Sequence, residues 1–116
     1  MSPLQTYFLQ VCAAGLLALG GTAERAAAAA EAAAPAAVTI KDFMFAPVTL
    51  TVKAGTLVTW VNRDDEPHTI FSDTGLFRSG ALDTGGDFHF KFDQPGTYHY
   101  LCTIHPHMVG TIIVEQ

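Results

Sequence analysis

The sequence predicts an all-β fold, a β-sandwich of about seven to eight short strands. Three observations support this prediction. From residue 38 onward, apolar and polar residues alternate with period two in several short runs. Gly and Pro separate these runs, and no segment among them has the periodicity of an amphipathic helix. Short alternating strands with frequent turns and no helix are typical of a two-layer sandwich.

The N-terminal third has a different composition and is rich in Ala and Leu. We interpret residues 1–23 as a secretory signal peptide with an uncertain cleavage site, because the apolar run at 7–20 is short and interrupted by Gly. No Lys or Arg precedes that run, so an uncleaved membrane anchor or a misassigned start codon remains an alternative. Residues 24–35 form an Ala-rich spacer with no apolar stripe. Residues 36–116 are left as one folded domain, small enough for a bound metal to add useful stability.

Within this domain the strands follow in order. The runs 48–53, 56–62, 87–92, 97–102 and 110–115 are predicted as strands, with turns at 54–55 and 94–96. Residues 72–86 form one long connection. The alternation predicts a core and a solvent-facing set. The expected core residues are Val48, Leu50, Val52, Trp60, Phe88, Phe90, Phe92, Tyr98 and Tyr100, and the expected exposed ones are His89, Lys91 and His99.

Composition excludes several classes of protein. Six basic against eleven acidic side chains give a net charge of −5, which disfavours nucleic-acid binding. A hydrophobic content of 49% excludes a mainly disordered chain, and two cysteines cannot build a disulfide scaffold. The acidic run at 64–66 is interpreted as a solvated loop that would favour a cationic partner.

The C-terminal loop concentrates the chemistry. Cys102, His105 and Met108 recur at intervals of three, and Pro106 indicates a loop between two strands rather than a helix. His68 lies upstream, in a strand expected after the acidic run. Two imidazoles, a thiolate and a weak thioether are the donor set of a type 1 copper site, and the thioether would have no role in structural zinc.

Two alternatives concern these donors. Met44 competes with Met108 for the axial role, although its position in the run 43–45 favours strand packing. His107 is an alternative to His105, but the two-residue gap after Cys102 favours His105.

These motifs give the chain a family resemblance. FMFAP at 43–47, PH at 67–68, FxSG at 77–80, PGTY at 95–98 and CxxHPxM at 102–108 resemble the cupredoxins, especially the amicyanin, pseudoazurin and plastocyanin group. The resemblance covers nearly all of 36–116. It implies a Greek-key sandwich that holds one Cu(I)/Cu(II) ion, with His68, Cys102 and His105 as strong equatorial ligands and Met108 as the long axial one.

The resemblance also implies a function. Cupredoxins of this kind are periplasmic in bacteria and shuttle single electrons between redox proteins, such as a c-type cytochrome or a periplasmic dehydrogenase. We therefore expect a monomeric electron carrier that is not an enzyme, binds no nucleic acid and meets a membrane only if its N-terminal segment is retained.

Two departures from the family pattern leave alternatives open. Thr69 stands where the family often has Asn, and His107 where an apolar residue is commoner. A looser site with extra donors would suit a copper-delivery or copper-buffering protein on the same fold. A hydrolase that uses Cys102 and His105 is a third hypothesis, but no orienting Asn or Asp lies near His105 in the sequence.

Overall fold

The computed structural model describes residues 33–116, which fold into strands and connecting loops. The predicted fold class is confirmed, with eight strands. They are β1 (Ala36–Lys41), β2 (Met44–Ala46), β3 (Thr49–Lys53), β4 (Thr56–Asn62), β5 (Phe71–Ser72), β6 (Asp87–Phe92), β7 (Gly96–Leu101) and β8 (Val109–Glu115). Within the described range no helix is long and apolar enough to cross a membrane. The predicted signal peptide and nearly all of the predicted spacer lie outside the described residues.

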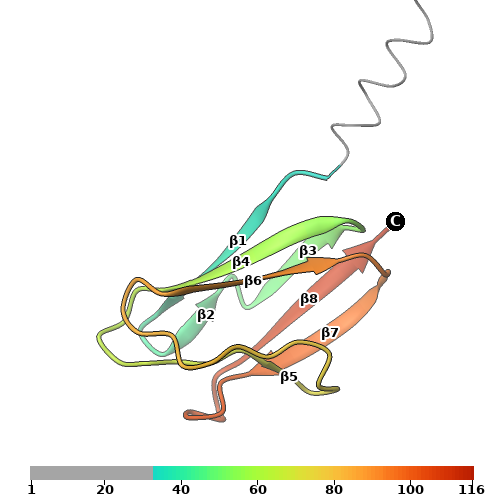
Figure 1. Cartoon of the computed structure of the whole chain (residues 1–116). Helices are drawn as coiled ribbons and strands as arrows, with labels where there is room; N and C mark the ends of the chain where they lie inside the picture. Colours follow the sequence, from blue (N-terminus) through green and yellow to red (C-terminus); the bar gives the residue numbers. More distant parts are fainter. Residues whose placement is uncertain (1–32) are drawn as a thin grey trace, which may run out of the picture. The chain divides into compact units, whose positions relative to one another are not determined.

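The strands form two four-stranded sheets that face each other (Figure 1). One sheet has the order β2-β1-β4-β6 and the other β3-β8-β7-β5. From β2 to β7 the chain changes sheet at every connection, as expected of a Greek-key sandwich. Each sheet contains one parallel pair, β1 with β4 and β3 with β8, and in both pairs the strands are separated in the chain, as parallel pairing requires.

The core lies between the sheets and is centred on Trp60 of β4, which is fully buried. The Trp60 ring contacts aromatic side chains of both sheets and of the long connection, with centroid distances of 5.5 Å to Tyr100, 5.6 Å to Phe88 and 5.8 Å to Phe77. The period-two prediction is therefore correct for the central strands. It also correctly placed His89, Lys91 and His99 at the surface.

The core prediction is wrong or incomplete at the sheet edges. Val48 is 54% exposed, because it precedes β3 and its side chain lines a surface hollow. Phe88 and Phe90 are only partly buried, since β6 is the last strand of its sheet and has no neighbour on one side. Tyr98 is likewise partly buried. Met44 was expected to pack within its strand, but β2 turns Phe45 inward and leaves Met44 57% exposed.

Candidate metal centre

His68 comes from the loop that follows β4. It forms an isolated bridge with Leu82, in which each backbone N–H donates to the other residue's carbonyl at 3.1 and 2.8 Å. The expectation that His68 belongs to a regular strand is therefore wrong, although its backbone is tied to the long connection. Asn62 orders the start of this loop, donating from its buried side chain to the carbonyls of Glu66 and Leu82, both at 2.8 Å.

Cys102 begins the loop between β7 and β8. Its N–H donates to the carbonyl of Met108 at 3.1 Å, and the N–H of Met108 donates to the carbonyl of His105 at 2.9 Å. These two bonds close the seven-residue segment into a compact turn. The spacing of three that the sequence shows therefore arises in a closed loop and not on a helix.

The two segments bring three donor atoms together. Sγ of Cys102 lies 3.8 Å from Nδ1 of His68 and 3.8 Å from Nδ1 of His105, and all three donors lie within 4.8 Å of one another. Cys102 and His68 are fully buried, whereas the His105 side chain is 21% exposed. One imidazole therefore leads from the donor cluster to the surface.

These distances can be tested against a bound ion. A sulfur and two imidazole nitrogens at these separations can share one ion, and thiolate together with imidazole is a donor set that suits copper. The chemistry and the spacing of the donors therefore fit a mononuclear copper site.

The surroundings of Cys102 favour its thiolate. Burial by itself raises the pKa of the thiol. Against this, the sulfur accepts a bond from the N–H of Thr69 at 3.4 Å and contacts the imidazoles of His68 and His105 and the N–H of His105. Together these contacts lower the pKa of Cys102 from 9.0 to about 6. The metal-free protein therefore favours the thiolate, the form of Cys102 that binds a metal.

Asp64 is a site residue that the sequence interpretation missed. It was assigned to a solvated acidic loop, but it is buried, and its Oδ2 accepts a bond from Nε2 of His68 at 2.9 Å. This bond turns Nδ1 of His68 toward Cys102, an arrangement typical of metal-binding histidines. Its position four residues before His68 is the feature of the sequence that could have identified it. The neighbouring Asp65 and Glu66 are exposed, as expected of a solvated loop.

The same carboxylate holds the β1–β2 turn. Asp64 accepts the N–H groups of Asp42 at 2.7 Å and Phe43 at 2.9 Å. Burial raises the pKa of the Asp64 carboxyl, but these N–H groups and His68 outweigh it and hold the pKa below the ordinary value of 3.8. The carboxylate thus remains ionised while it organises two segments of the site.

The β1–β2 turn places an aromatic ring on the donor cluster. Asp42 and Phe43 have positive φ angles of 53° and 58°, an arrangement unfavourable for a bulky residue such as Phe43. The Phe43 ring meets the imidazoles of His68 and His105 edge-on, at centroid distances of 5.3 and 5.0 Å. The bonds to Asp64 therefore support a strained turn that covers both histidines.

Thr69, which stands where the family often has Asn, connects the two segments that carry the donors. Its hydroxyl accepts the N–H of Thr103 at 2.8 Å and lies 2.8 Å from the Thr103 hydroxyl. Because Thr69 follows His68 and Thr103 follows Cys102, these bonds join the two donor-bearing segments directly.

The remaining predicted residues lie around this cluster. Met108 is 2% exposed and closes the loop through its backbone. His107 is exposed and outside the cluster, with its ring 6.4 Å from that of His105. Of the two loop histidines, it is His105 and not His107 that contacts the Cys102 sulfur.

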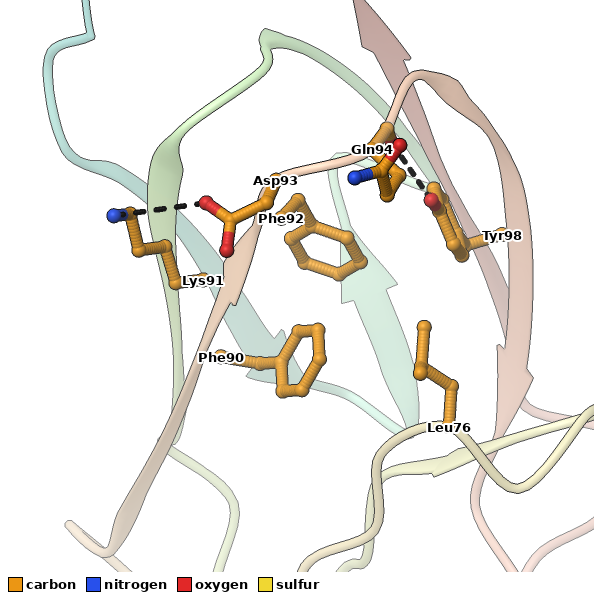
Figure 2. A pocket seen from close by; sticks show the side chains of 7 residues that line it. All are labelled: Leu76, Phe90, Lys91, Phe92, Asp93, Gln94 and Tyr98. Carbon is orange, nitrogen blue, oxygen red and sulfur yellow. Dashed lines mark hydrogen bonds and ion pairs between the residues drawn. The ribbon is translucent and has the colours of Figure 1, made fainter.

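A hollow elsewhere on the sandwich has different chemistry. Figure 2 shows Phe90 and Phe92 of β6 facing Leu76 across it, with Tyr98 donating to the carbonyl of Gln94 at 2.6 Å. The lining residues are Leu76, Phe90, Lys91, Phe92, Asp93, Gln94 and Tyr98, none of which offers sulfur or imidazole. This hollow is therefore no second candidate metal centre.

Known proteins share both the sequence pattern and the fold. The cupredoxin-like domain model matches residues 11–114. Amicyanin-alpha of Methylorubrum extorquens is 38% identical over 113 residues, 89% of this chain and 95% of the relative. Plastocyanin of Scenedesmus fuscus is 40% identical over 85 residues, 62% of this chain and 87% of that protein.

A solved structure is similar in three dimensions. The purple cupredoxin of Nitrosopumilus maritimus superposes with a TM-score of 0.64 at 35% identity, covering 69% of this chain and 99% of its own. The domain match, the relatives and the donor geometry agree, and the chain belongs to the cupredoxin family.

Proposed function

We propose that this protein is a mononuclear type 1 copper protein that carries single electrons between redox partners. The observation that carries the proposal is the convergence of Cys102, His68 and His105, with sulfur–nitrogen separations of 3.8 Å. Copper would supply the redox change, and the three donors would hold both of its oxidation states. Met108 would be the weak axial ligand, since it is buried at the end of the same loop.

The burial pattern supports electron transfer rather than bond chemistry. Cys102 and His68 are shielded from solvent, and only the edge of His105 reaches the surface. An electron could pass through this edge while substrates and water stay away from the ion. The protein is therefore a carrier and not an enzyme. The carboxylate beside His105, that of Glu66, lies 3.9 Å from Nε2 and is 61% exposed, which is too distant and too solvated to orient a catalytic base for the hydrolase hypothesis.

A copper-delivery role also lacks support. Delivery to another protein requires donors that an acceptor can approach, whereas two of the three are fully buried and Thr69 fastens their segments together. As a discriminating measurement, the copper-loaded protein should retain its metal against a competing metal-free acceptor through repeated redox cycles.

The partners and location follow the family. We infer that the protein is periplasmic, acts as a monomer and meets a c-type cytochrome or a periplasmic dehydrogenase transiently. The exposed apolar side chains Phe43, Ile104 and Val109 near the donor loop would suit such short encounters.

The visible spectrum tests the proposal. Titration of the metal-free full chain with Cu(II) should give an intense blue or green band that saturates at one equivalent, bleaches with ascorbate and returns on oxidation. Cys102→Ser should abolish the band, and retention of the band in that variant would overturn the assignment. Met108→Leu should keep an intense band at a changed energy, because the axial thioether tunes the site without creating its colour.

A further inference from the structure

Two side chains near the metal centre, a thioether and an imidazole, have no role in the proposed carrier. Met44 and His107 are exposed, and both line one hollow of about 310 Å³ together with Met108. We propose that Met44 and His107 form an outer Cu(I) capture site, from which the ion passes by way of Met108 to the inner centre. The inference rests on the proposed function, because it supplies the copper that the carrier uses.

The fold brings these donors together from distant parts of the sequence. Met44 starts β2 and points outward, while His107 and Met108 end the donor loop just before β8. The other lining residues are Phe43, Phe45, Val48 and Val109. Thus the hollow contains two thioethers and one imidazole within an otherwise apolar wall.

This composition selects for Cu(I). Thioether sulfur is a soft donor that binds Cu(I) well and hard divalent cations poorly, and imidazole is an effective additional ligand. No carboxylate lines the hollow, so nothing there compensates a divalent charge. A monovalent soft ion is therefore the cation that this hollow fits.

The inner centre needs such an approach. Cys102 and His68 have no exposed surface, and the His105 side chain is only 21% exposed. An incoming ion therefore first meets donors at the surface. Met44, at 57% exposure, is the exposed sulfur of this hollow.

The path inward is short and needs no redox step. Met108 belongs to the hollow and to the loop that holds Cys102, whose N–H donates to the Met108 carbonyl. The His107 ring lies 6.4 Å from the His105 ring, centroid to centroid. The ion can thus exchange outer for inner donors one at a time and remain Cu(I), with no electron transferred.

Loading kinetics test the role of the outer donors. Cu(I) is supplied to the metal-free full chain as a complex with a colourless chelator, and samples taken over time are oxidised so that the blue band reports the inner centre. If each lost donor weakens capture by about 1.4 kcal/mol, Met44→Leu and His107→Gln should each slow loading about tenfold. Leu nearly preserves the volume of Met, so the hollow keeps its shape.

Matched controls separate capture from folding. His89→Gln removes an exposed imidazole outside the hollow, and Leu57→Ala removes an exposed apolar side chain that does not line it. Both should load at the rate of the parent chain. Equal loading rates for the parent and a Met44→Leu/His107→Gln double variant would overturn the proposal.

A second measurement does not depend on the blue band. Silver(I), a soft monovalent ion without visible colour, is added to Cys102→Ser, and the labelled methyl groups of methionine are followed by NMR. The Met44 methyl signal should shift, and His107→Gln should weaken that response. An unmoved Met44 signal would refute the outer site, whereas failure of the carrier proposal would show separately as a missing blue band in the parent chain.

Discussion

Asp64 is the residue through which the loops around the donors are coupled. Its carboxylate accepts Nε2 of His68 and the N–H groups of Asp42 and Phe43, so one side chain orients a metal donor and supports the turn that covers it. Charge-assisted bonds of this kind are stronger than neutral ones, and three of them converge on a buried group.

Asp64→Asn should therefore disturb both stability and the copper centre. An amide offers one acceptor oxygen in place of two, so at least one buried donor loses its partner, which should lower the free energy of unfolding by about 1–3 kcal/mol. Loss of the negative charge beside His68 should raise the reduction potential, because Cu(II) loses more stabilisation than Cu(I). Denaturation and voltammetry measure the two effects. Asp65→Asn makes the same charge change at an exposed neighbour and should alter both much less; equal effects would contradict the coupling role.

At the scale of elements, the β7–β8 hairpin links the core to the donor loop. Tyr100 of β7 pairs with Gly110 of β8, and a Cβ on Gly110 would overlap the ring of Tyr100. That ring also packs against Phe45 of the other sheet at 4.7 Å. The glycine thus lets an aromatic side chain cross its own hairpin and join the two layers just beyond the donor loop.

Gly110→Ala should consequently destabilise the protein by overpacking. Displacement of the Tyr100 ring from a filled core should cost about 1–3 kcal/mol, and guanidinium denaturation of the metal-free protein measures this loss. Gly80→Ala is the matched control, because a Cβ there meets open space. If both variants were as stable as the parent, Tyr100 would not be held against Gly110 as the structure indicates.

At the scale of the whole molecule, the sequence predicted most of the fold because alternation along a strand directly reports which face is buried. The prediction of buried residues failed where burial depends on neighbouring segments and not on alternation alone. Val48 alternates correctly with Val52 but precedes β3, and the apolar residues of β6 lie at a sheet edge, where no further strand covers them. Cys102 and His105 stand out in the sequence because their spacing is local, whereas Asp64 was missed because two of its partners, the N–H groups of Asp42 and Phe43, lie on the β1–β2 turn. No periodicity within 64–66 distinguishes the buried acid from its exposed neighbours.

The ionisation of Cys102 connects the centre to global stability. The pKa of this thiol is about 6 in the folded metal-free protein and 9.0 as the ordinary value. A depressed pKa means that the unfolded chain binds more protons between these values, so the free energy of unfolding should rise with pH from about 6 to about 9. The slope contributed by one such group is at most about 1.4 kcal/mol per pH unit, and the contribution is lost as the pH falls through 6.

Thermal or chemical unfolding of the metal-free chain across this range measures the effect, with the ultraviolet absorbance of the thiolate recorded in parallel. Cys102→Ser keeps the size of the side chain but cannot ionise in this range, and its stability should lack the Cys102 contribution to the slope. The thiolate absorbance of the parent should appear near pH 6 rather than near 9. An identical pH dependence in parent and variant would mean that the fold does not stabilise the thiolate, and that the hydrogen bond from Thr69 and the two imidazoles do not prepare the sulfur for a cation.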